Sequence, residues 1–164
     1  MSGVAKRSPM FVVGGGLLAL GIARAMRRTG VPVAVFTATA ESLLPYSRRC
    51  RLVSVAPGDD GALLRAVLTE AANCATPPVL IPAGDKALLF SCTHADQLGE
   101  RVRMVLPSLD AARTVLEKDR FDAYAQQHAV PVPQSWVFTD PDELRQEAAH
   151  LPYPLAVKPS VSTH

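Results

Sequence analysis

A block of three glycines near the N-terminus limits the folds open to this chain. Gly14, Gly15 and Gly16 follow a short apolar run, residues 10–13, and precede a segment with helical spacing, residues 17–28. Glycine tolerates the backbone conformations that a tight turn between a strand and a helix requires. We therefore expect a strand, a glycine turn and a helix, in that order.

The segment after the glycines predicts an amphipathic helix and then a second strand. Its apolar spacing of i, i+4, i+7 and i+8 predicts a core-facing side made of Leu18, Ile22, Ala25 and Met26. Gly30 is placed to end the helix, and residues 31–36 predict the second strand. A strand, a helix and a strand of this combined length form the unit that joins parallel neighbours in a sheet.

A secretory signal peptide is the alternative interpretation of this stretch. Lys6 and Arg7 precede the apolar residues, as the charged start of a leader would. The glycine block interrupts the apolar run, however, and Arg24, Arg27 and Arg28 follow where a cleavage region disfavours charge. The run is also shorter than the ~20 apolar residues that a membrane span needs. We therefore favour the strand and the helix.

Strands and helices continue to alternate as far as residue 106. The further predicted elements are strands at residues 51–55, 79–82 and 102–106 and helices at residues 60–72 and 86–92. The helix over residues 60–72 has one apolar face, made of Leu64, Val67, Leu68 and Ala71. Strands that are apolar on both faces and alternate with helices predict an α/β fold: a Rossmann-like, mostly parallel sheet with helices on both faces.

The pattern changes near residue 110, which predicts a domain boundary between residues 1–110 and residues 111–164. The predicted elements beyond it are helices at residues 109–116, 119–128 and 140–150, an extended connector at 130–133 and a strand at 155–158. Asp140, Pro141 and Glu143 are the residue types that favour the start of a helix. The last strand would be an unpaired apolar edge, which favours aggregation.

Charge and cysteine content exclude several kinds of partner and site. The chain carries 17 basic and 15 acidic side chains, a net charge of +2, which is too balanced to indicate a nucleic-acid or membrane partner. Cys50, Cys74 and Cys92 are far apart in sequence and have no histidines at metal-binding spacing. We expect reduced thiols that pack as small apolar residues, a cytoplasmic protein and no metal site.

The glycine turn could hold an anion, because backbone N–H groups and the helix dipole favour negative charge at a helix N-terminus. The dinucleotide-binding fingerprint is incomplete here. Ala19 stands where that fingerprint has a third glycine, and Thr37 stands where it has an acidic residue. We therefore favour glycines that form a tight turn, with Gly21 allowing close packing, over a nicotinamide or flavin site.

Two lysines of the second region are candidates for chemistry. Lys118 lies between two acidic residues, where a solvated ion pair is the ordinary explanation. Lys158 ends an apolar segment, so its charge needs a polar pocket, such as one that holds phosphate oxygens.

Five segments are informative when taken in order along the chain: residues 10–16, residues 79–82 with Asp85, and residues 117–121, 130–133 and 154–159. This ordered set resembles the N-terminal portion of the ATP-grasp carboxylate–amine ligases, the superfamily that includes D-alanine–D-alanine ligase and biotin carboxylase. The resemblance covers almost the whole chain, and the chain is similar in particular to the D-aspartate-ligase-like branch.

The resemblance implies a Rossmann-like pre-ATP-grasp domain over residues 1–110 and the truncated start of an α+β ATP-grasp domain over residues 111–164. It implies that Lys118 and Lys158 contact the phosphates of ATP. The residues implied to border the site for the carboxylate substrate are Gly14, Gly15, Gly16 and Asp85. In the family, the γ-phosphoryl group of ATP is transferred to a small-molecule carboxylate with the help of Mg²⁺, and an amine attacks the resulting acylphosphate.

The resemblance also implies that the chain is a fragment. The Ser/Gly-rich loop over the phosphates and the Glu and Asn ligands of Mg²⁺ follow further downstream in the family, so we expect the isolated chain to lack ligase activity. A non-catalytic Rossmann-like binding module for a small anion or nucleotide, and a nucleotide-sugar or dinucleotide enzyme, remain open as alternatives. The sequence identifies neither the carboxylate nor the amine, and it does not distinguish a monomer from a homodimer.

Overall fold

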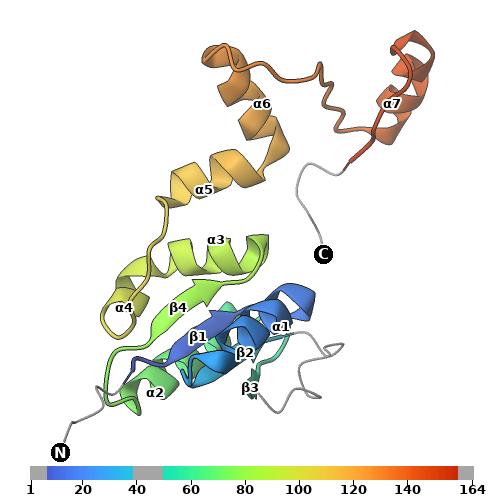
Figure 1. The fold of residues 1–164 in the computed structure, drawn as a ribbon. Helices are drawn as coiled ribbons and strands as arrows, with labels where there is room; N and C mark the ends of the chain where they lie inside the picture. The colour runs from blue at the N-terminus through green and yellow to red at the C-terminus, as the bar shows by residue number, and fades with distance from the viewer. Residues whose placement is uncertain (1–6, 39–49, 159–164) are drawn as a thin grey trace, which may run out of the picture. The chain divides into compact units, whose positions relative to one another are not determined.

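The chain divides into two compact units, Met1–Leu109 and Asp110–His164. The structure is a computed structural model, and it describes residues 7–38 and 50–158, so Lys6 lies outside the described residues. Figure 1 follows the chain through its helices and strands. None of the helices in the described ranges is long and apolar enough to cross a membrane.

The first unit contains a four-stranded parallel sheet (Figure 1). Its strands are β1 (Met10–Val13), β2 (Val33–Thr37), β3 (Arg51–Ser54) and β4 (Val79–Pro82). The strand order is β3-β2-β1-β4, so β1 is a central strand that pairs with β2 on one side and with β4 on the other. The predicted α/β class with a parallel sheet is confirmed.

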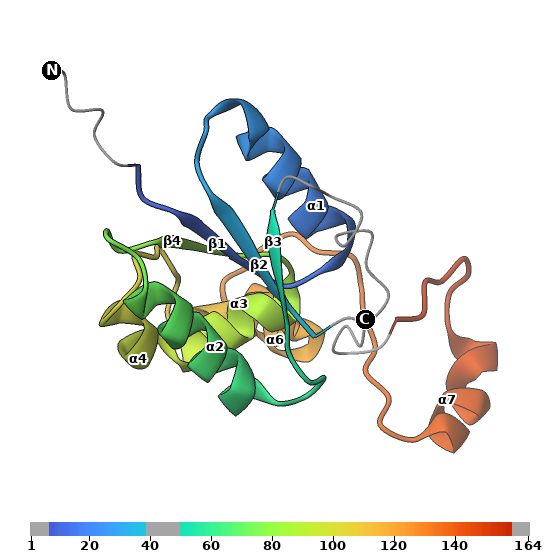
Figure 2. The ribbon, with the colours of Figure 1, turned by 90° about the horizontal axis from the view of Figure 1, so that it is seen from below.

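Helices cover both faces of the sheet, as predicted. The helices of this unit are α1 (Gly16–Ala25) with the short η1 (Met26–Arg28), α2 (Asp60–Ala72), α3 (Asp85–Thr93) and α4 (Ala95–Gly99). Figure 2 shows α1 on one side of the strands and α2, α3 and α4 on the other. The two hydrophobic clusters of the unit lie on these two faces.

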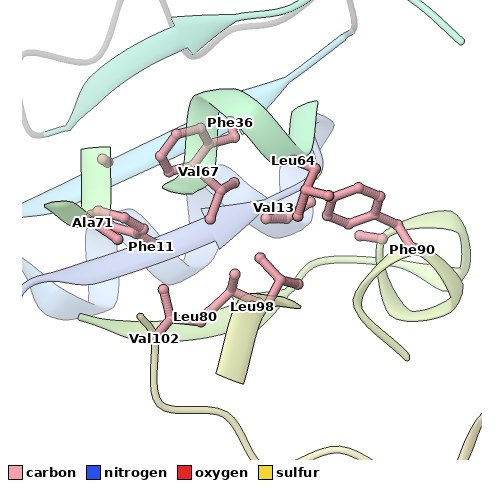
Figure 3. Packing of buried hydrophobic residues seen from close by; sticks show 12 residues of the cluster. Phe11, Val13, Phe36, Leu64, Val67, Ala71, Leu80, Phe90, Leu98 and Val102 are labelled. Atoms are coloured by element: carbon pink, nitrogen blue, oxygen red, sulfur yellow. The ribbon is translucent and has the colours of Figure 1, made fainter. Parts of the chain in front are cut away.

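The period-two alternation of the strands divides side chains between the two clusters. Phe11 and Val13 of β1 belong to the larger cluster, with Phe36 of β2 and buried side chains of α2, α3 and α4 (Figure 3). The ring centroids of Phe11 and Phe36 lie 5.0 Å apart, and the two rings are tilted relative to each other. Val12 points to the opposite face, where it packs in the cluster that includes α1.

Helix α1 buries the predicted face only in part: Ile22 and Met26 pack, partly buried, against the cluster on its side of the sheet. Its buried residues are Ala19, Leu20 and Ala23, whereas Leu18 is 56% exposed. The alanines present so little bulk that the helix can lie close to the strands, and their face is therefore the one that packs. Gly21 is not needed for close packing, because a Cβ atom at this residue would meet nothing within 4 Å.

Helix α2 packs as its sequence pattern predicts. Leu64, Val67 and Ala71 are buried in the larger cluster, as Figure 3 shows. The Asp59 side chain accepts a hydrogen bond of 2.7 Å from the Ala62 N–H, which satisfies one of the unpaired donors at the start of the helix. Local periodicity was sufficient to predict the buried face of this helix, and the cap at Asp59 agrees with the predicted start.

The strand predicted at residues 102–106 is wrong, and Pro82 gives the physical reason. Arg103 makes a single parallel bridge beside β4, with hydrogen bonds of 2.8 Å to the Pro78 carbonyl and 2.9 Å from the Leu80 N–H. In a continued ladder Val105 would donate to the Leu80 carbonyl and accept a hydrogen bond from the N–H of residue 82, and proline has no N–H. The chain therefore leaves the sheet, and Val105 is fully exposed.

The second unit is helical within its described residues. Its elements are α5 (Leu109–Leu116), which begins at the boundary, α6 (Lys118–Gln127), α7 (Pro141–Glu147) and η3 (Ala148–His150). Asp140 caps α7 as predicted, because its side chain accepts a 2.8 Å hydrogen bond from the Asp142 N–H. The strand predicted at residues 155–158 is wrong: this segment is irregular. A strand requires a partner, and none of the residues described between 110 and 158 forms one.

An ion pair ties the edge strand β3 to α2. The guanidinium of Arg51 donates two hydrogen bonds to the carboxylate of Glu70, one of them 2.8 Å long. The hydrogen bond from Arg51 is the largest influence on Glu70, and it holds the pKa of this carboxyl below its usual value. The pKa of Arg51 is raised by the same bond. The charged form of Glu70 is therefore favoured by folding.

We predict that Glu70→Gln lowers the free energy of unfolding at pH 7 by at most about 1 kcal/mol, because the Arg51 side chain is 56% exposed and water screens the pair. Glu70 has a lowered folded-state pKa, so its contribution is present above the pKa of the unfolded state, near 4.3. The contribution is lost as the pH falls through the folded-state value.

Urea unfolding of the wild type and of Glu70→Gln between pH 3 and pH 7 measures this effect. The stability difference between the two should shrink toward pH 3. The control is the effect of Glu70→Gln measured in an Arg51→Gln background, because Glu70 has lost its hydrogen-bond donor there. An equal effect of Glu70→Gln in both backgrounds would contradict the assigned cause.

Candidate functional site

The carboxyl ends of β1 and β4 form the topological switch point of the sheet. The chain leaves β1 through α1 and returns as β2 on one side of β1, whereas β4 lies on its other side. In open parallel sheets, ligands bind beyond the carboxyl ends of the strands at such a point. Both α1 and α3 begin there, so the backbone N–H groups of two helix starts are near this edge.

Gly14 brings the two turns at this point into backbone contact. The N–H of Gly14 donates a 2.8 Å hydrogen bond to the Phe36 carbonyl, and the N–H of Ala83 donates one of 2.7 Å to the Val13 carbonyl. Gly14 has a φ of +118°, and a Cβ atom there would lie 2.4 Å from the carbonyl oxygen of Ala83. Only glycine fits this position.

Other glycines of the two turns have open space where a side chain would otherwise stand. Gly15 is the N-cap of α1, and Gly84 is the N-cap of α3, so neither helix start has a side-chain cap. Gly16 and Gly84 have φ values of +67° and +111°, and a Cβ atom at either residue would meet nothing within 4 Å. Their backbone is therefore accessible to a small ligand.

Asp85 is the first residue of α3 and is exposed. A carboxylate at this place is favoured by the dipole of its own helix. The contact between Gly14 and Ala83 joins the β1–α1 turn to the turn that precedes Asp85, so the structure brings Gly14, Gly15 and Gly16 together with Asp85 at one edge of the sheet.

Sequence reasoning missed Gly84 and Ala83. The available signal was a second strand–glycine–helix segment, in which Gly84 stands between the apolar strand at residues 79–82 and Asp85. The pattern repeats that of the first turn with one glycine instead of three. Which two turns would touch could not be deduced locally, because it depends on the strand order.

The two candidate lysines lie on different elements of the second unit. Lys118 is the first residue of α6 and is partly buried. Lys158 is exposed in the irregular segment after η3, and the strand that was expected to carry it is absent. The lysines therefore form a second candidate set, separate from the glycine turns of the first unit.

The described side chains include no group of three or more His, Cys, Asp and Glu residues that could hold a metal ion. The cysteines carry free thiols. Burial raises the pKa of the Cys92 thiol, which disfavours the reactive thiolate. Ala19, at the place of the third fingerprint glycine, is fully buried against the sheet, so a small side chain is accommodated at this point of helix–strand contact.

Comparison with solved structures shows which known folds the chain resembles. An L-amino acid ligase from Bacillus licheniformis matches 96% of this chain with a TM-score of 0.69 at 20% identity. A carboxyaminoimidazole ribonucleotide synthase from Aspergillus clavatus, complexed with ATP, matches 89% with a TM-score of 0.59 at 19% identity. The biotin carboxylase domain of a Hydrogenobacter thermophilus 2-oxoglutarate carboxylase, in complex with MgADP, matches 91% with a TM-score of 0.54 at 17% identity.

These likenesses show that the chain has the fold of a part of each of these three enzymes. The chain spans 38%, 36% and 34% of the three matched chains, respectively. No protein-family model matches the sequence, and no curated protein does.

We predict that Gly14→Ala destabilises the first unit by about 3 kcal/mol or more, because it combines a strained φ with a backbone collision. Gly21→Ala is the matched control. It lies in the exposed middle of α1 with free space around it, and should stabilise by about 0.5–1 kcal/mol through helix propensity. Chemical unfolding of both variants measures the difference. Equal stabilities would contradict the close approach of the two turns.

Proposed function

We propose that this chain is the N-terminal part of an ATP-dependent carboxylate–amine ligase. The observation that supports this best is the match to the L-amino acid ligase, because it extends over 96% of the chain and therefore over both units. Fold likeness alone does not establish an activity. The glycine turns and the two lysines supply the residue chemistry that such a reaction needs.

The proposed reaction has two steps. An oxygen of the substrate carboxylate attacks the γ-phosphorus of ATP, the bond to ADP breaks and an acylphosphate forms. An amine then attacks the acyl carbon, phosphate leaves with the bonding electrons and the nitrogen loses a proton. Lys118 and Lys158 would lower the repulsion between the anionic carboxylate and the triphosphate.

The carboxylate substrate is assigned to the switch point of the first unit. The uncapped N–H groups at the start of α1 favour an anion, and Gly16 leaves room for a ligand to approach the backbone. Asp85, at the edge of the same site, would accept hydrogen bonds from a donor group of the substrate.

Mg²⁺ is proposed to accompany ATP, and the described side chains include no group of three or more His, Cys, Asp and Glu residues that could hold it. No step is therefore assigned to the metal here. A simple binding module for a small anion would give Lys118 and Lys158 no role, so the ligase is preferred. A place in the D-aspartate-ligase-like branch and a cytoplasmic location remain predictions of the same proposal.

We predict that Lys118→Gln and Lys158→Gln each weaken the binding of MgATP by about 10-fold or more, because each removes a charged hydrogen bond to phosphate. Isothermal titration calorimetry on the protein in the length that the source cell makes gives the dissociation constants. Lys86→Gln, an exposed lysine of α3, is the matched control and should bind as the wild type does. Undiminished binding by Lys158→Gln would contradict its phosphate role.

The intact mass of the endogenous protein tests the proposal that the chain belongs to a longer ligase. Capture with an antibody against the first unit, followed by mass spectrometry, should give a mass well above 17.5 kDa. A mass of 17.5 kDa would contradict this proposal and favour a binding or regulatory module.

A further inference from the structure

A single residue, Glu117, forms the corner between α5 and α6. Its N–H donates a 2.9 Å hydrogen bond to the Arg113 carbonyl at the end of α5. Its carbonyl accepts a 2.9 Å hydrogen bond from the Phe121 N–H in the first turn of α6. Lys118 is the next residue and the first of α6, so the geometry of this corner determines where the backbone of Lys118 lies.

Arg120 holds this corner through two carboxylates. Its Nε atom lies 2.9 Å from Oε2 of Glu117, and one of its terminal nitrogens lies 3.2 Å from Oδ1 of Asp110 in the first turn of α5. The side chain of Glu117 is 27% exposed, so part of its interaction with Arg120 is shielded from water. A guanidinium suits this task because its donors are fixed in a planar fork.

The charges around Lys118 are predominantly negative without Arg120. Glu117 and Asp119 flank the lysine in sequence, and Asp110 joins them through the folded corner. Negative charge close to Lys118 would repel the phosphates of ATP and offset the attraction of the lysine. The guanidinium of Arg120 pairs directly with two carboxylates, and its one positive charge offsets one of their two negative charges.

We infer that Arg120 is a positioning residue of the nucleotide site: it holds Glu117 and Asp110 and lowers the net negative charge beside Lys118, so that Lys118 can act on the phosphates of ATP. This inference rests on the proposed function. It assigns no contact between Arg120 and the nucleotide. The effect of Arg120 therefore depends on the carboxylates that it holds.

The test is the affinity for MgATP, measured by calorimetry on the protein in the length that the source cell makes. Arg120→Gln should weaken binding by about three- to tenfold, since it removes one positive charge from the group of carboxylates beside Lys118. The loss should be smaller at high salt, where the charges of this group are screened. Arg120→Gln combined with Glu117→Gln should recover most of the affinity, because the group then has the net charge of the wild type again.

Arg145→Gln is the matched control. Arg145 forms an ion pair of the same i,i+3 spacing with Asp142 on α7, in the same unit, and both side chains are mostly exposed. Its loss should leave the affinity for MgATP within about twofold of the wild type, because exposed pairs contribute little. Circular dichroism of each variant reports whether the helices remain formed.

The outcomes separate this inference from the proposed function. If Lys118→Gln binds MgATP as the wild type does, the proposed function is wrong and the inference is overturned with it. If Lys118→Gln weakens binding and Arg120→Gln does not, only the inference is overturned. If the Arg120→Gln, Glu117→Gln double variant is as weak as Arg120→Gln alone, Arg120 acts through structure and not through charge, which also overturns the inference.

Discussion

The backbone contact between Gly14 and Ala83 is the constraint on which the organisation of the first unit depends. Strands β1 and β4 pair as far as Val13 and Pro82, and the chain must then turn into helices that lie on opposite faces of the sheet. A side chain at residue 14 would force the two turns apart. Because the turns touch, the uncapped helix starts and Asp85 meet at one edge, and the candidate site follows from this packing.

The sequence predicted best those features that are decided within a few residues. The apolar face of α2 and the cap at Asp140 were recognisable because each depends on residues close together in the sequence. The packing face of α1 was recognisable only in part, since apolar residues lie on more than one side of that helix. Leu18 was predicted to face the core, but the closeness of helix and sheet selects the side with Ala19, Leu20 and Ala23.

Features that depend on a distant partner were predicted poorly. A strand at residues 102–106 requires donors along β4, and Pro82 removes the one that would extend the ladder beyond Arg103. A strand ending at Lys158 requires a neighbour that the described part of its unit does not contain. The candidate site residues were proposed one by one from a family resemblance, but the meeting of two glycine turns depends on strand order. Periodicity carries no information about strand order.

The proline at the end of β4 also bears on how the molecule behaves among its own copies. An open sheet edge is a template on which an extended chain from another molecule can add by backbone hydrogen bonding. At the outer edge of β4, Arg103 occupies the first pairing position and Pro82 offers no donor at the next. A strand from a second molecule would find little to bind there, so Arg103 and Pro82 together protect this edge against edge-to-edge association.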